Sequence, residues 1–306
     1  MTESRRWTDV VRWLATRKPI EWPTSVEVQP QKIPTERVMG HDLRVTFINH
    51  STVLFQTEGL NFLTDPIWSK RCGPFGMVGP KRVCAPGVNL EDLPPIDYVL
   101  ISHNHYDHLD LPTIKRLQRA HDPIFCIGEG NRRWLARRGV ARVEEFGWWQ
   151  DLRINPDVTI TFVPAKHYTR RGVFDSNRTL WGGFVVTGEQ GAVYFAGDTG
   201  FGPHFDEIRT FFGEIRLALL PIGAYSPRWF MGPFHTSPDD AVQAHQNLDA
   251  SMSIGVHYGT FQLSDEAYDA PVTELKSALK RRRVSPDHFR VLEPGQGLDV
   301  PTRIGQ

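Results

Sequence analysis

Residues 101–110 read Ile-Ser-His-Asn-His-Tyr-Asp-His-Leu-Asp, and this stretch indicates both the fold class and the chemistry of the chain. Four metal-binding side chains follow one another closely: His103, His105, Asp107 and His108. Burying such polar groups without partners would cost several kcal/mol each. Alternate residues of an extended turn point the same way, so the first two histidines can bind one cation and the last two residues can reach a second. Imidazole and carboxylate together suit zinc, and also manganese or iron.

The residues before the cluster favour this interpretation. Asp97-Tyr98-Val99-Leu100-Ile101-Ser102 is a short apolar run, β-branched in part, which predicts a buried strand that ends at the ligand loop. The alternative is a histidine-rich solvated loop that binds nothing. Such tracts usually lie in low-complexity sequence, whereas this one directly follows a predicted strand.

Composition limits the classes of function. The 306 residues suffice for one large domain or two smaller ones. Lys plus Arg and Asp plus Glu both number 35, so no overall electrostatic field argues for a nucleic-acid partner. Three cysteines without a Cys-x-x-Cys pair disfavour a disulfide framework. The chain shows no signal peptide and no apolar run near about 18 residues, so we expect a cytoplasmic protein, with peripheral membrane attachment left open.

Residues 1–40 differ in character from the rest, and we predict an N-terminal arm there, followed by a folded domain over 41–306. The arm carries basic and aromatic residues, among them Arg5, Arg6, Trp13 and Arg17, and then several prolines that break any helix. Two interpretations remain open. The arm packs its tryptophans on the body of the protein, or it forms an amphipathic segment that touches an anionic membrane surface as a lid or anchor.

The remaining pattern alternates short strands with helices. We predict strands at 44–48, 52–56, 60–63, 97–102, 123–127 and 158–163, and helices at 112–120 and 131–138. Short strands separated by helices and long polar loops predict a sheet-rich α/β sandwich with its helices outside.

Two ions that share a water molecule need more ligands than the cluster supplies, and three further candidates each follow a predicted strand. His167 comes after the strand at 158–163, Asp198 lies in a Gly-Asp-Thr-Gly turn, and His257 precedes Tyr258-Gly259. The glycines of the turn allow a close backbone approach. We therefore predict that the first ion binds His103, His105 and His167, that the second binds Asp107, His108 and His257, and that Asp198 bridges them.

This order of ligands resembles the signature of the metallo-β-lactamase superfamily, over residues 43–298. The resemblance implies an αββα sandwich, with two mixed β-sheets flanked by helices, over the domain at 41–306. It also implies a hydrolase with two divalent metal ions, Zn²⁺ being the expected metal, at one edge of the sheets.

A narrower resemblance is to the N-acylphosphatidylethanolamine-hydrolysing phospholipases D. It rests on residues 62–67, 79–82, 93–110, 179–182, 195–200, 221–225, 227–231 and 257–261. It implies cleavage of a phosphodiester in an N-acylated phospholipid, or in another small molecule, to give phosphatidic acid and an N-acylethanolamine. The metal cluster alone does not choose between phosphorus and carbon, so a lactonase or carboxylic-ester hydrolase is the alternative. A non-catalytic metal-binding or membrane-adaptor protein is a third hypothesis, and a homodimer is left open.

Four residues have expected roles around the ions. Asp198 would position the attacking hydroxide as well as bridge. His235 matches a histidine near the phosphate in the resembled family and would assist the leaving oxygen, unless it only opens the helix after Ser237. Tyr106 would hydrogen-bond the substrate phosphate, unless it packs under the loop. Asp65 would orient a ligand histidine rather than bind metal itself.

Overall fold

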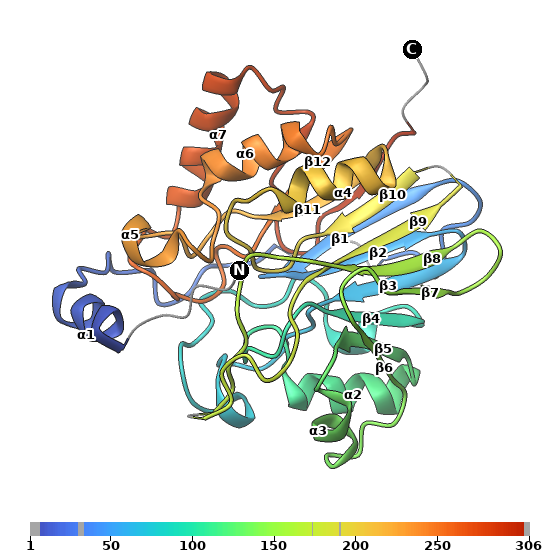
Figure 1. The fold of residues 1–306 in the computed structure, drawn as a ribbon, viewed down its shortest axis with the longest axis horizontal. Helices are drawn as coiled ribbons and strands as arrows, with labels where there is room; N and C mark the ends of the chain where they lie inside the picture. The colour runs from blue at the N-terminus through green and yellow to red at the C-terminus, as the bar shows by residue number, and fades with distance from the viewer. Residues whose placement is uncertain (1–6, 30–33, 173, 190, 303–306) are drawn as a thin grey trace.

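The computed structural model describes residues 7–29, 34–172, 174–189 and 191–302. Arg5, Arg6 and residues 30–33 of the predicted arm therefore lie outside the described residues. Within the described ranges the chain forms two seven-stranded β-sheets, which lie face to face with helices on both outer sides (Figure 1). The predicted αββα sandwich is confirmed.

The first sheet has the strand order β14-β1-β2-β3-β4-β5-β6. Its strands are β1 (Leu43–Asn49), β2 (Thr52–Thr57), β3 (Leu60–Thr64), β4 (Tyr98–Ile101), β5 (Ile124–Gly128), β6 (Val143–Phe146) and β14 (Gly297–Asp299). Strands β14 to β3 pair antiparallel, and strands β3 to β6 pair parallel. The sheet is therefore mixed, and the parallel strands β3 and β4 end at the same edge.

The second sheet has the order β13-β12-β11-β10-β9-β8-β7. Its strands are β7 (Asp151–Arg153), β8 (Thr159–Val163), β9 (Gly183–Gly188), β10 (Gly191–Phe195), β11 (Ile215–Pro221), β12 (Met252–Val256) and β13 (Phe289–Arg290). Strands β7 to β10 pair antiparallel and strands β10 to β13 pair parallel. The parallel group brings the ends of β10 and β12 to one edge.

The core follows from the alternation of side chains along each strand. On β3, Phe62 points between the sheets and Leu63 points outward to the helices. On β4, Leu100 joins the central cluster, whereas Val99 and Ile101 face outward. Both faces of the central strands are thus apolar, which is why these segments read as continuous apolar runs in the sequence.

Helices cover the outer face of each sheet. The first sheet carries α2 (Leu111–His121) and α3 (Arg132–Ala136), and the second carries α4 (His204–Phe212), α6 (Pro238–Asn247) and α7 (Ala270–Arg282). The 3₁₀ turns η1 (Pro74–Gly76) and η2 (Leu90–Asp92) interrupt the long loop between β3 and β4. The helix predicted to reach residue 138 ends earlier, because the chain turns at Gly139, whose φ is +81°.

The N-terminal helix α1 (Trp7–Thr16) packs against α5 (Arg228–Met231). The ring of Trp13 stacks on Phe230 with centroids 4.8 Å apart, and its indole N–H donates to Asp265 over 3.3 Å. The opposite face of α1 leaves Val11 61% and Leu14 58% exposed. One face of α1 therefore packs on the body of the protein through Trp13, and the other face exposes Val11 and Leu14. None of the described helices combines the length and the apolar character that a membrane-crossing segment needs.

Candidate metal centre

The candidate ligands gather at one edge of the sandwich because each follows the end of a strand. The loop after β4 carries the His-x-His-x-Asp-His cluster, and His167, Asp198 and His257 follow β8, β10 and β12. Gly197 makes the approach possible: its φ is +61°, and a Cβ there would lie 2.4 Å from the Cβ of Ser102. Only glycine fits between β10 and the ligand loop at this position.

A first group of imidazole nitrogens converges as predicted. The His105 Nδ1 lies 2.8 Å from His103 Nε2 and 3.3 Å from His167 Nε2. A tetrahedral zinc ion with Zn–N distances of about 2.05 Å holds its nitrogen ligands about 3.3 Å apart. The His167 Nδ1 donates its N–H to the Phe234 carbonyl over 3.0 Å, so the Nε2 of this neutral imidazole faces the group with a lone pair. This triangle therefore fits one divalent cation.

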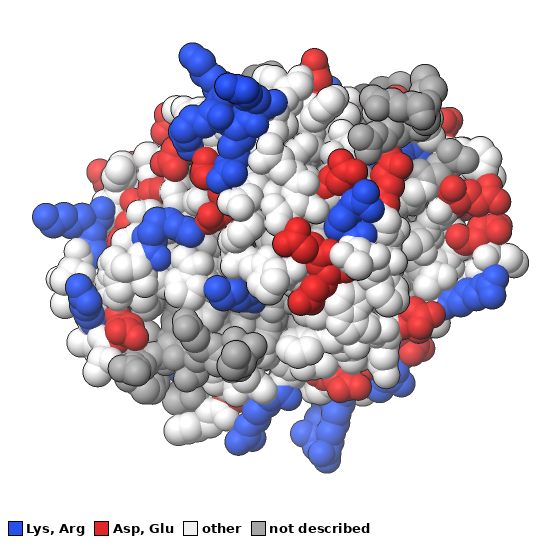
Figure 2. Space-filling view, turned by 45° about the horizontal axis from the view of Figure 1, so that its top comes forward, with Lys and Arg blue, Asp and Glu red and all other residues white. Residues whose placement is uncertain are grey.

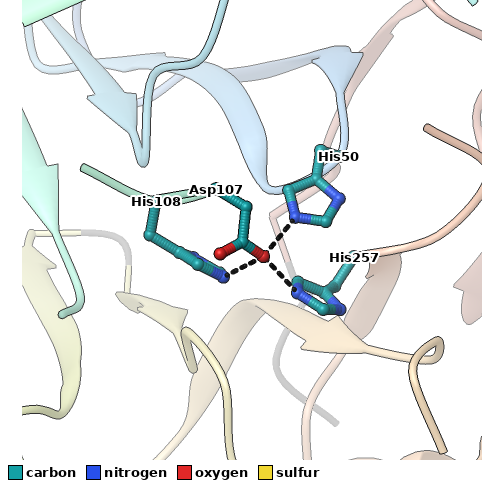
Figure 3. A group of neighbouring side chains, drawn as sticks. All are labelled: His50, Asp107, His108 and His257. Carbon is teal, nitrogen blue, oxygen red and sulfur yellow. Dashed lines mark hydrogen bonds and ion pairs between the residues drawn. The ribbon is translucent and has the colours of Figure 1, made fainter. Parts of the chain in front are cut away.

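A second group lies beside the first and surrounds one carboxylate oxygen (Figure 3). Asp107 Oδ2 is 3.2 Å from His108 Nε2, 3.4 Å from His257 Nε2 and 3.1 Å from His50 Nε2. The Nε2 atoms of His108 and His257 are buried, and their contacts with these carboxylate oxygens lack the alignment of a hydrogen bond. Buried nitrogen atoms without a hydrogen bond are costly, and a second cation would satisfy them.

The Asp198 carboxylate lies between the two groups. Its Oδ2 is 3.7 Å from His167 Nε2, in the first group, and 3.2 Å from His108 Nε2, in the second. Its Oδ1 is 3.2 Å from His257 Nε2. The structure thus brings together all seven predicted ligands, and Asp198 contacts histidines of both groups.

Asp65 supports ligands of both groups from behind. It is fully buried, and its Oδ2 is 2.5 Å from His108 Nδ1. The same oxygen accepts from the Ser102 hydroxyl, which also contacts His103 Nδ1 over 2.9 Å. A carboxylate that holds the Nδ1 proton of a histidine leaves the Nε2 lone pair directed at the metal.

The ionisation of the first group suits metal binding. Burial lowers the pKa of His105 to about 4 and the pKa of His167 to about 3. Burial, reinforced by the charge of His108, also holds the pKa of His103 well below 6.5. These three imidazoles are therefore neutral at physiological pH, and their lone pairs are available without loss of a proton.

The second group is charged differently. Burial lowers the pKa of His108, but the carboxylates of Asp198 and Asp107 outweigh it and hold this pKa well above 6.5. Burial raises the pKa of Asp198, and the charges of His108 and His257 outweigh that effect, so its pKa lies well below 3.8. Without ions His108 is therefore an imidazolium, and a cation that binds here displaces its proton.

The two other predicted catalytic residues occupy different positions. His235 Nδ1 lies 3.8 Å from Asp198 Oδ2, and the His235 ring is 5.1 Å from that of His167, so this residue does reach the centre. The hydroxyl of Tyr106 instead donates to the carbonyl of Arg171 over 3.0 Å. The Arg171 guanidinium covers the Tyr106 ring at 4.0 Å and donates to the carbonyls of Asn104 and Leu109. Tyr106 therefore packs against Arg171, whose hydrogen bonds hold the ligand loop in place.

The sequence interpretation missed His50, the fourth member of the second group. Its side chain is 1% exposed, at the turn between β1 and β2. Burial lowers the pKa of His50 to about 3, so the imidazole is neutral. The available signal was its place at the end of an apolar strand, which it shares with the predicted ligands.

The two-sheet sandwich and the His/Asp groups at its edge fit a metal-dependent hydrolase. The chain belongs to the family described as the β-lactamase superfamily domain, whose sequence profile matches residues 60–258. The predicted superfamily is therefore confirmed.

Individual relatives indicate which members of this superfamily the chain resembles. The chain is 37% identical to N-acyl-phosphatidylethanolamine-hydrolyzing phospholipase D 1 of Caenorhabditis elegans, over 85% of this chain and 78% of that protein. It is 31% identical to the mitochondrial N-acyl-phosphatidylethanolamine-hydrolyzing phospholipase D of Saccharomyces cerevisiae, over 86% of this chain and 61% of that protein. A solved metallo hydrolase of the archaeon Ignicoccus hospitalis has the same fold, with a TM-score of 0.63 and 22% identity, over 85% of this chain and 99% of that one.

Proposed function

We propose that this protein is a binuclear, zinc-dependent phosphodiesterase of the phospholipase D type. It cleaves an N-acylated phospholipid and releases phosphatidic acid and an N-acylethanolamine. The observation that carries the proposal is the position of Asp198 between two groups of imidazole nitrogens. The substrate class is supported by the identity to the two phospholipases named above.

The ions and two residues of the chain, Asp198 and His235, would each have a separate role in the reaction. Two divalent ions held here would supply Lewis-acid catalysis and an activated water molecule. Asp198, which accepts but does not donate at physiological pH, would orient that water through its free lone pairs. His235, at the rim of the centre, would transfer a proton to the oxygen that leaves the phosphorus atom.

The surroundings of the centre suit a lipid substrate. A cavity of about 330 Å³ adjoins His167. Its lining is mostly apolar and includes Trp148, Ala165, Pro203 and Phe234. On the face drawn in Figure 2, acidic residues lie among the basic ones, apart from one basic group near the upper edge. We take this mixed surface to favour a small molecule over an extended polyanion such as a nucleic acid.

A substrate panel tests the proposal. Zinc-loaded protein is assayed with N-acylated phospholipids, lactones and bis-aryl phosphodiesters, and the products are identified by mass spectrometry. We expect phosphatidic acid and N-acylethanolamine from the first class, and loss of activity in the double variant His103→Ala, His105→Ala. Hydrolysis of lactones alone would replace the proposal by the carboxylic-ester alternative, and full activity of the double variant would refute the assigned centre.

We also propose that the outward face of α1 contacts an anionic membrane surface. Val11 and Leu14 are exposed there, and Arg12 lies over the exposed Trp229 ring at 4.7 Å. The double variant Val11→Ser, Leu14→Ser should lose activity on anionic vesicles and keep it on a soluble phosphodiester. Phe211→Ser, which removes an equally exposed apolar side chain from α4, is the control. Equal losses on both substrates would contradict the proposal.

A further inference from the structure

His50 occupies an unusual position for a buried histidine. It lies in the two-residue turn between β1 and β2 with a φ of +50°, a conformation that residues other than glycine seldom adopt. Its backbone N–H donates to the Thr260 hydroxyl over 2.9 Å, which fixes the turn. The imidazole is thereby directed at the second group of ligands.

The carboxylate contacts of His50 differ from those of the predicted ligands around it. His108 Nε2 and His257 Nε2 each lie 3.2 Å from an oxygen of Asp198 as well as near Asp107. Among the described residues, the carboxylate contact of His50 is with Asp107, at 3.1 Å. The Nε2 of His50 therefore differs from those of His108 and His257, because its carboxylate partner is Asp107 and not Asp198.

His50 also touches a second ligand of the same group. Its backbone carbonyl accepts from the His257 N–H over 2.8 Å, and the centroids of the two rings are 4.2 Å apart. His257 itself has a φ of +60°. The turn between β1 and β2 is thus bound to the loop that follows β12. His50 contacts Asp107 and His257 directly, and its ring centroid lies 5.5 Å from that of His108.

We propose that His50 is a positioning residue for the second metal ion. Its Nε2–H donates to Asp107 Oδ2 and fixes the carboxylate so that its remaining lone pairs face the ion. The direction of this hydrogen bond follows from chemistry, because an ionised carboxylate can only accept. Partners of this kind usually raise metal affinity by about 10–100-fold. The inference rests on the two-ion centre proposed above and makes His50 specific to one of its halves.

Two substitutions distinguish positioning from direct ligation. His50→Gln retains an N–H donor near the position of Nε2, and His50→Leu removes it while keeping an apolar side chain of similar size. His245→Gln is the matched control, because His245 is also a buried histidine but bonds Ser253 on the far side of the second sheet. Zn²⁺ is titrated into each metal-free protein against a chelating dye, which yields the number of ions bound and their dissociation constants. Circular dichroism checks that each variant is folded.

We expect the unaltered protein and His245→Gln to bind two ions. His50→Leu should bind the first ion normally and the second about 10–100-fold more weakly. His50→Gln should restore the second dissociation constant to within about threefold. Unchanged binding by His50→Leu would overturn the inference, and so would equal weakening of both ions. If His50→Gln is as weak as His50→Leu, His50 is a ligand and the positioning role is refuted. A failure of the unaltered protein to bind two ions would refute the proposed centre instead.

Discussion

Replacing Asp65 by asparagine tests the prediction that Asp65 orients a ligand of the second ion and does not bind metal itself. In the structure Asp65 Oδ1 accepts from the Ser102 N–H over 2.7 Å, and Oδ2 faces His108 Nδ1. If the asparagine keeps its oxygen on Ser102, its NH₂ group faces His108 Nδ1 and can only donate. The His108 proton then moves to Nε2 and blocks the lone pair that the metal needs.

The expected loss is about 10–100-fold in affinity for the second ion, which corresponds to about 1.4–2.7 kcal/mol. The assay is the same zinc titration against a chelating dye, at a fixed neutral pH. Asp110→Asn is a close control, because Asp110 is buried and accepts from the backbone N–H and the hydroxyl of Ser69. Within the described part of the chain, Asp110 bonds no histidine. Wild-type affinity in Asp65→Asn, or an equal loss in Asp110→Asn, would refute the reasoning.

Two further predictions concern stability. Burial lowers the pKa of His245 from 6.5 to about 4, so the unfolded chain takes up a proton that the folded chain resists, and the free energy of unfolding should fall by about 3 kcal/mol as the pH drops through this range. Denaturant unfolding at several pH values should show this slope, and His245→Gln should reduce it; parallel curves would contradict the assignment. Arg171→Met leaves the carbonyls of Asn104 and Leu109 without this donor, which should cost about 2–3 kcal/mol in the same measurement. An unchanged free energy of unfolding would show that these two hydrogen bonds of Arg171 do not stabilise the fold.

Much of the centre could be predicted because its ligands obey a local rule. His103, His167, Asp198 and His257 each follow an apolar segment that is recognisable as a strand, and the parallel strands of a sheet end at the same edge. The outer order of the sheets could not be predicted in this way. The edge strands β13 and β14 are two and three residues long, so they exist only through their pairing with distant strands.

The roles of Tyr106 and His50 depend on contacts between distant parts of the chain. The Tyr106 hydroxyl donates to the carbonyl of Arg171, and the sequence around Tyr106 does not predict that distant partner. His50 follows a strand like the predicted ligands, but a single histidine in a tight turn has the same sequence pattern as a histidine that is merely buried and hydrogen-bonded. Only the folded structure shows that Asp107 lies opposite its ring.

The ligands come from both sheets of the sandwich: His103 and Asp107 follow β4 of the first, whereas His167 and Asp198 follow β8 and β10 of the second. Bound ions would therefore cross-link the two halves of the molecule at this edge. Ligands that bind only the folded state stabilise it by mass action, so depletion of the metal should shorten the lifetime of the protein in the presence of a protease. The supply of the ion would then govern both how much of the protein is active and how much of it survives.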